Sequence, residues 1–225
     1  MAGENPVDLP STTGIHDLVF DTSVGDSMRY SLYLPTKTPC DGTQVLALVL
    51  HYGGQASGFY GHPLLVQLVQ PALDTLNAIM VAPVSLGGDW STIQNELAVL
   101  ELFAVIEQSY ATDCTRRLIT GYSMGGAGTW HIVEQHPDYF SAAVAISGFK
   151  PIVAASCKTP IFTLLSRADS IFNPDQLSSL VERLVAAGCN AKANFIDDVD
   201  HFTIPAFAPL LTGTIPWLRK IWGED

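Results

Sequence analysis

Residues 118–126 of this chain read Leu118-Ile119-Thr120-Gly121-Tyr122-Ser123-Met124-Gly125-Gly126. An apolar run ends here in Gly-x-Ser-x-Gly, and a segment with helical patterning follows it. Between a strand and a helix, this motif predicts a nucleophile elbow, a sharp turn that lifts a serine hydroxyl out of a sheet. The turn brings Gly121 and Gly125 together, where side chains would collide. We expect a strained backbone at Ser123, with the positive end of the following helix directed at it.

The composition predicts one globular domain, spanning residues 1–225. Of these 225 residues, 48% are hydrophobic and 15% are charged, which argues against disorder and allows a large core. The formal net charge of -11 disfavours nucleic acids and anionic membranes as partners.

The N-terminal residues have no basic segment followed by an apolar one, and no apolar run reaches the length of a membrane span. We therefore expect a cytoplasmic protein if the chain is full-length, and a secreted one only if a signal peptide has been removed. Four scattered cysteines, without zinc spacing, are expected to be free thiols, with one or two disulfides as the alternative in an exported protein. They are Cys40, Cys114, Cys157 and Cys189.

The order of the elements predicts an α/β fold. Residues 18–20 and 28–35 are expected to form a hairpin around Gly25-Asp26, since residues 28–34 alternate between apolar and other side chains. Apolar runs then alternate with helical patterns, which is typical of a mostly parallel sheet covered by helices on both faces. Expected strands follow at residues 45–50, 79–84, 118–119, 141–146, 160–165 and 194–196.

Three helices are predicted with specific features. Residues 63–77 should be helical in two pieces, because Pro71 interrupts the pattern. A capping box at Ser91 and Gln94 should start a second helix, with an apolar face of Ile93, Leu97, Leu100 and Ala104. Asn173 should cap a third, with Gln176 completing a capping-box-like pair, a buried face of Leu177, Leu180, Leu184 and Val185, and an end at Gly188. A closing helix is expected over residues 215–222.

The candidate catalytic residues are Ser123, Asp169 and His201. A serine needs a base, and the base needs a carboxylate that fixes its tautomer. In this architecture the chain order is Ser, Asp or Glu, then His. His201 is the only histidine after Asp169, and each of the three candidates follows its own strand. Alternatives for the carboxylate are Asp175, Asp197, Asp198 and Asp200.

Ester or amide chemistry also needs donors for a developing oxyanion. One should be the backbone N–H of Met124, the residue after the serine. The other should come from the loop after residues 45–50, where Gly53 is the first choice and Gly54 the second.

With these residues the chain resembles an α/β-hydrolase. Within that fold it is similar to the phospholipase/carboxylesterase and feruloyl-esterase-like group, which includes polyhydroxybutyrate-depolymerase-like esterases and proteins called predicted peptidases. The similarity rests on residues 121–130 (Gly-Tyr-Ser-Met-Gly-Gly-Ala-Gly-Thr-Trp), 136–144 (His-Pro-Asp-Tyr-Phe-Ser-Ala-Ala-Val) and 146–148 (Ile-Ser-Gly). The resemblance implies an eight-stranded sheet, ester hydrolysis, and no metal or organic cofactor.

One position departs from the family. Its loop usually reads His-Gly before the oxyanion residue, and here Tyr52 replaces that glycine. Tyr52 is a candidate for the acyl pocket, and Trp90 is a second aromatic candidate for the cleft wall, with simple packing as its alternative. No insertion is long enough for a separate lid, so an open cleft for short-acyl or aryl esters is expected.

The sequence therefore predicts a serine carboxylic-ester hydrolase acting on a small-molecule ester. A serine peptidase and a dienelactone-hydrolase-like lactonase are the alternatives among enzymes. A non-catalytic binding protein of the same fold is the alternative from another class, although no triad residue is missing.

Overall fold

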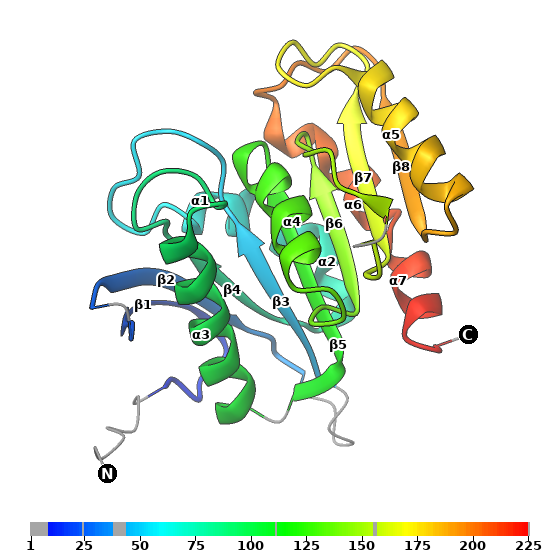
Figure 1. Ribbon diagram of the computed structural model, residues 1–225. Coiled ribbons are helices and arrows are strands. Elements are labelled where there is room, and N and C mark those ends of the chain that lie inside the picture. Colours follow the sequence, from blue (N-terminus) through cyan, green and yellow to red (C-terminus); the bar gives the residue numbers. More distant parts are fainter. Residues whose placement is uncertain (1–8, 24, 38–43, 111, 155–156, 225) are drawn as a thin grey trace.

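Eight strands form one sheet in the computed structural model, which describes residues 9–23, 25–37, 44–110, 112–154 and 157–224 (Figure 1). The strands are β1 Gly14–Asp21, β2 Ser27–Leu34, β3 Gln44–Leu50, β4 Ile79–Pro83, β5 Thr112–Tyr122, β6 Ala142–Ile146, β7 Ile161–Ser166 and β8 Ala191–Ile196. Their order in the sheet is β1-β2-β4-β3-β5-β6-β7-β8. Strands β3 to β8 pair in parallel, whereas β1 pairs with β2, and β2 with β4, in antiparallel fashion. The predicted eight-stranded α/β fold and its opening hairpin are confirmed.

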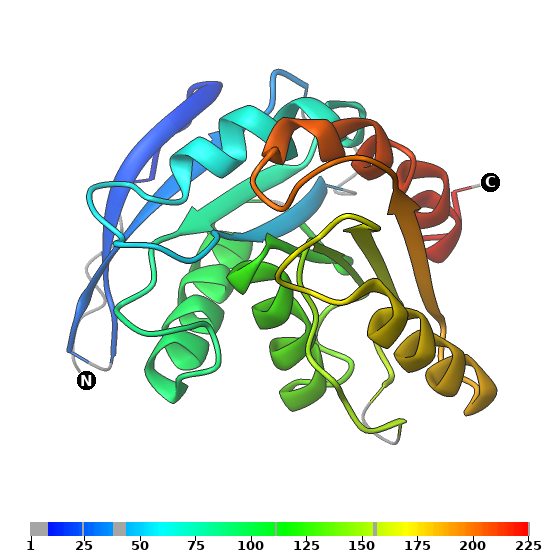
Figure 2. The same cartoon turned by 90° about the horizontal axis from the view of Figure 1, so that it is seen from above.

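The helices cover both faces of the sheet (Figure 2). They are α1 His62–Leu64, η1 Leu65–Val69, α2 Gln70–Leu73, η2 Asp74–Leu76, α3 Ile93–Ser109, α4 Met124–Gln135, α5 Pro174–Ala186, η4 Ile204–Phe207, α6 Ala208–Thr212 and α7 Ile215–Ile221. One core cluster lies between the sheet and α3, α4 and α5, and the other between the sheet and α1, α2, α6 and α7. Every residue of β3, β4 and β6 is buried, as expected for strands covered on both sides.

Pro71 does not divide residues 62–76 into two helices. The chain instead passes through a π-helical turn, η1, and Pro71 then lies in the first turn of α2. The N–H of Gln70, the residue before Pro71, still donates to the carbonyl of Leu65, so the helical path continues up to the proline.

The predicted start of α3 is wrong, and its predicted apolar face is wrong at two of four positions. Thr92 is the N-cap, accepting from the N–H of Asn95, while the hydroxyl of Ser91 donates to Asp89. Two side chains expected in the core are exposed, Ile93 by 62% and Leu97 by 46%, whereas Leu100 packs against the core. The buried residues of the helix are Asn95, Glu96, Ala98, Val99, Leu102, Phe103 and Ile106.

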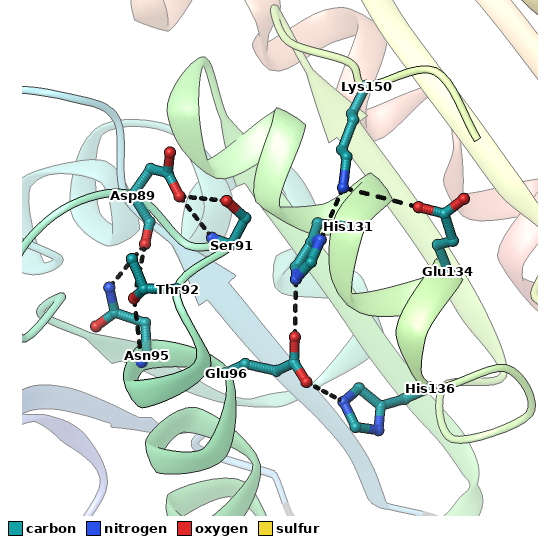
Figure 3. A network of polar contacts seen from close by, with 9 residues as sticks. All are labelled: Asp89, Ser91, Thr92, Asn95, Glu96, His131, Glu134, His136 and Lys150. Atoms are coloured by element: carbon teal, nitrogen blue, oxygen red, sulfur yellow. Dashed lines mark hydrogen bonds and ion pairs between the residues drawn. The ribbon is translucent and has the colours of Figure 1, made fainter.

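A polar network connects the buried side of α3 to α4 and the loop after it (Figure 3). The carboxylate of Glu96 lies 2.7 Å from Nε2 of His131 and 2.9 Å from Nε2 of His136, and Nζ of Lys150 lies 2.9 Å from Nδ1 of His131. Burial alone would raise the pKa of Glu96, but its bonds to His136 and His131 hold that pKa below the ordinary value. A buried carboxylate is acceptable in this position because it has partners on α4 and in the loop that follows α4.

The predicted start of α5 is confirmed, and its buried face is confirmed in part. Asn173 accepts hydrogen bonds from the N–H groups of Asp175 and Gln176, and Leu177, Leu180 and Leu184 are buried. Val185 is 53% exposed, so its place in the buried face is a wrong prediction. The helix ends at Ala186, and Gly188 follows with a positive φ of 89°.

Cys114, Cys157 and Cys189 are free thiols, and Cys40 lies outside the described residues. In the part of the chain that the structure describes, no helix is long and apolar enough to cross a membrane.

Candidate active site

Ser123 lies in the turn between β5 and α4, with φ 55° and ψ -113°. A side chain rarely occupies this region, and such strain is typical of functional sites. The surrounding glycines are required by space: a Cβ on Gly121 would overlap the backbone of Gly125, and one on Gly125 would overlap the carbonyl of Leu50. The predicted strand-turn-helix geometry is present, and the N-terminus of α4 points at the serine.

Three candidate residues from distant parts of the chain meet at this turn. Oγ of Ser123 lies 2.8 Å from Nε2 of His201, and Nδ1 of His201 lies 2.8 Å from Oδ2 of Asp169. The side chains of His201 and Asp169 are 3% and 0% exposed. In this arrangement Nδ1 donates its proton to the carboxylate, which leaves the Nε2 lone pair facing the serine hydroxyl.

Among the alternative carboxylates, Asp197 forms an exposed ion pair with Arg167, and Asp200 accepts from the N–H of Phe202 and the hydroxyl of Thr203. Asp175 lies in the first turn of α5. The carboxylate in contact with His201 is that of Asp169.

Asp169 is fixed by four donors. Its Oδ1 accepts from the N–H groups of Ile171 and Phe172, both at 2.9 Å, and its Oδ2 accepts from His201 and from Oγ of Ser147. Burial pulls the pKa of Asp169 upward, but the N–H of Phe172, the imidazole of His201, the Ser147 hydroxyl and the N–H of Ile171 hold it below its ordinary value. The group is therefore an anion at neutral pH.

Two residues in contact with the candidate catalytic residues were not predicted. Ser147 donates to Asp169 at 2.7 Å, and the hydroxyl of Tyr122 donates to the carbonyl of His201 at 2.8 Å. Burial raises the pKa of Tyr122, so it remains a neutral donor. Their positions in the sequence could have indicated them. Tyr122 ends β5 next to Ser123, and Ser147 directly follows β6 at the same sheet edge.

The loop after β3 is held by His51. Its Nδ1 donates to the carbonyl of Tyr52 at 2.7 Å, and its Nε2 accepts from the N–H of Ser85 at 3.0 Å. Burial lowers the pKa of His51 to about 4, against the opposing effect of the bond to Tyr52, so the imidazole is neutral. His51 therefore anchors the loop that carries Gly53 and is not in contact with the triad.

The two candidate oxyanion donors lie next to each other. A Cβ placed on Gly53 would be 3.7 Å from Cβ of Met124. Met124 is the first residue of α4, so its N–H has no acceptor within the helix. Gly54, the second choice, has φ 141°, and a Cβ there would overlap the hydroxyl of Tyr60. The loop thus needs a glycine at position 54 for backbone reasons alone.

A pocket of about 430 Å³ opens at Ser123. It is lined by Tyr52, Gly53, Tyr122, Ser123, Ile171, His201, Phe202 and Ile204. Tyr52 lies in its wall, and its ring packs edge-on to those of Tyr60 and Tyr122. The wall is mainly apolar, with the serine, the histidine and two phenols as its polar groups.

Trp90 is not among the residues of this pocket. It is fully buried, its indole N–H donates to the carbonyl of His51 at 2.9 Å, and a Cβ on Gly128 would meet its side chain. The structure therefore gives Trp90 a packing position between the His51 loop and α4, the alternative considered for it. Within the described part of the chain, no group of three or more His, Cys, Asp or Glu side chains could hold a metal ion.

The fold and the site together define a serine hydrolase with the α/β-hydrolase fold. A family model for esterases matches residues 22–190, and the chain belongs to this esterase family. It is a carboxylesterase-type hydrolase. A comparison with curated proteins gives no match.

Several solved structures share the fold. A thermostable esterase is 20% identical with a TM-score of 0.75; the match covers 92% of this chain but only 62% of that one. A ferulic acid esterase is 18% identical with a TM-score of 0.74, over 92% of this chain and 98% of that one. A fluorophosphonate-binding serine hydrolase of Staphylococcus aureus is 13% identical with a TM-score of 0.72, over 91% and 98%.

Proposed function

We propose that this chain hydrolyses small carboxylic esters with a short acyl or aryl acid group, with Ser123 as nucleophile, His201 as general base and Asp169 as the group that orients His201. The observation that carries the proposal is the continuous chain of contacts from Oγ of Ser123 through His201 to Asp169, at the bottom of an open pocket. Neutral imidazole accepts the serine proton, and the buried carboxylate stabilises the imidazolium that forms.

The reaction has two steps. Oγ of Ser123 bonds to the ester carbon while Nε2 of His201 takes its proton, and His201 then returns that proton to the leaving alcohol. Water next attacks the acyl-enzyme, gives a proton to His201, and releases the acid as the serine recovers its hydrogen. The backbone N–H groups of Gly53 and Met124 donate to the oxyanion in both steps.

The pocket wall supports the proposed substrate class. Tyr52, Ile171, Phe202 and Ile204 offer aromatic and aliphatic surface next to Ser123. Phe202 and Ile171 are 74% and 55% exposed, so they flank an open entrance. Such a wall suits a compact apolar or planar aryl group. Peptides and lactones are the competing substrate classes, and the substrate panel described below includes both.

Labelling with a fluorophosphonate probe tests the nucleophile. The probe should modify wild-type protein at Ser123, and Ser123→Ala should be unlabelled and lose on the order of a thousandfold or more in kcat on p-nitrophenyl acetate. The melting temperature should stay close to that of wild type, because the hydroxyl serves the reaction rather than packing.

Ser179→Ala is the matched control, because Ser179 is exposed on α5 and should keep both labelling and activity. A panel of p-nitrophenyl esters, feruloyl esters, lactones and peptides then ranks substrates by kcat/KM. Retention of most activity in Ser123→Ala, or a preference for peptides over every ester, would reject the proposal.

A further inference from the structure

Ser147 occupies an unusual position for a serine. It follows Ile146, the last residue of β6, is fully buried, and has φ 49°. Only a few per cent of residues other than glycine adopt a positive φ, because Cβ crowds the backbone there. A side chain kept at such a cost points to a role for the side chain itself.

The Ser147 hydroxyl contacts two members of the triad. Its Oγ lies 2.7 Å from Oδ2 of Asp169 and 3.3 Å from Nδ1 of His201. Nδ1 of His201 carries a proton, because Nε2 must accept from Ser123. The single hydroxyl proton of Ser147 is therefore donated to the carboxylate.

The turn that carries Ser147 also touches the nucleophile. The N–H of Ser123 donates to the carbonyl of Ile146 at 2.8 Å, and a Cβ on Gly148 would overlap the Ser123 carbonyl. The N–H of Ser147 donates to the carbonyl of Leu164 in β7 at 2.7 Å. Residues 146–148 thus link the nucleophile turn to the strand that leads to Asp169.

We propose that Ser147 is a positioning residue of this hydrolase: its hydroxyl fixes the rotation of the Asp169 carboxylate and, through it, the orientation of His201. The inference rests on the proposed triad. It adds a fourth side chain that contacts neither substrate nor oxyanion and acts only through Asp169.

The effect of losing the Ser147 hydroxyl on the pH profile depends on the groups around Asp169 and His201. Asp169 is surrounded by the N–H groups of Ile171 and Phe172, His201 and Ser147, while His201 also faces Ser123 and the exposed carboxylate of Asp200. The neutral hydroxyl of Tyr122 lies on the His201 carbonyl. Without the Ser147 donor, the Asp169 charge is less satisfied and binds the imidazolium more tightly. The acidic limb of the pH profile should therefore move to higher pH.

Ser147→Gly and Ser147→Ala test this idea together. Both remove the hydroxyl, and glycine also relieves the positive φ, so Ser147→Gly should fold even if Ser147→Ala is destabilised. We expect kcat on p-nitrophenyl acetate to fall on the order of tenfold to a hundredfold in Ser147→Gly, with KM nearly unchanged. The midpoint of the acidic limb of kcat/KM should move to higher pH.

Thr120→Val is the control for loss of a buried hydroxyl. Oγ1 of Thr120 donates to the carbonyl of Val144 at 2.7 Å in the same part of the sheet, without touching the triad. In Thr120→Val, the midpoint of the acidic limb of kcat/KM should equal that of wild type. A folded Ser147→Gly with wild-type kcat and midpoint, or an equal shift in Thr120→Val, would overturn the role of Ser147. Full activity in Ser123→Ala would instead reject the proposed triad itself, so the two failures are distinguishable.

Discussion

Tyr52 is the residue at which this chain departs from the family it resembles, and its ring lies in the pocket wall beside Ser123. Burial raises the pKa of its phenol, with a further contribution from Tyr60, so the hydroxyl keeps its proton. Two roles compete: the ring shapes the acyl pocket, or the hydroxyl donates to the oxyanion. The adjacent backbone groups of Gly53 and Met124 favour the first.

Substitution of Tyr52 separates these roles. Tyr52→Phe should change kcat on p-nitrophenyl acetate only mildly, because the ring remains. Tyr52→Ala should favour bulkier acyl groups, with kcat on acetate esters maintained. A fall in kcat of roughly a hundredfold in Tyr52→Phe alone would instead identify the hydroxyl as an oxyanion donor.

The buried imidazole of His51 predicts how the free energy of unfolding depends on pH. Its pKa falls from 6.5 in the unfolded chain to about 4 in the folded one, so the unfolded state binds more protons below pH 6.5. The resulting stability is present above pH 6.5 and is lost as the pH falls towards 4. This loss amounts to about 3 kcal/mol of unfolding free energy.

Urea unfolding at several pH values between 7 and 4 measures this loss. In His51→Gln, the fall in unfolding free energy over this range should be smaller than in wild type by about that amount. Carboxylates contribute to both proteins, so the difference between the two curves isolates His51. Parallel curves would contradict the assignment of a buried neutral imidazole.

At the scale of elements, α3 shows that a buried helix face can combine apolar residues such as Leu102 and Phe103 with polar ones such as Glu96. Glu96 joins α3 to His131 on α4 and to His136 just after it (Figure 3). Leu97, the next residue, is 46% exposed. The directional bonds of Glu96 and the burial of Val99, Leu102 and Phe103 favour the same rotation of α3.

Glu96→Ala and Leu97→Ala therefore form an informative pair. Glu96→Ala should lower the free energy of unfolding by about 3 kcal/mol, because it leaves two histidines without their acceptor. Leu97→Ala should cost less than about 1 kcal/mol, since much of the side chain is already in water. Chemical denaturation measures both, and a larger loss in Leu97→Ala would show that the apolar face predicted from the sequence is the true one.

At the scale of the whole molecule, the site exists because parallel strands end at one edge. Ser123 follows β5, Asp169 follows β7 and His201 follows β8, and 78 residues separate the serine from the histidine that contacts it. These three loops meet where ligands bind in open α/β sheets. The site thus depends on the complete sheet.

His201→Ala should abolish ester hydrolysis, because the serine proton then has no imidazole to accept it. His62→Gln is the control, since His62 pairs with Asp17 and should keep wild-type activity. The rate of p-nitrophenyl acetate hydrolysis by each purified variant measures this. EDTA should have no effect, and strong inhibition by it would indicate a metal-dependent mechanism.

The sequence by itself determined the class of fold and the three candidate triad residues. Strand β3 is apolar after its first residue, Gln44, and Gly121 and Gly125 mark a turn that only glycines allow. The chain order of Ser123, Asp169 and His201 follows from the handed connections of the sheet, so a linear pattern carries it. Asn173 was predictable for a different, local reason, because an N-cap bonds to its own neighbours in the chain.

Only the tertiary structure decided what depends on contacts between distant segments. It placed Glu96 inside and Leu97 outside, buried Trp90 under the His51 loop, and brought the Ser147 hydroxyl to Asp169. Hydropathy ranks side chains by their cost of leaving water, and it does not record which partners will offset that cost. A buried polar side chain is defined by its partners, and those partners are adjacent only in the folded chain.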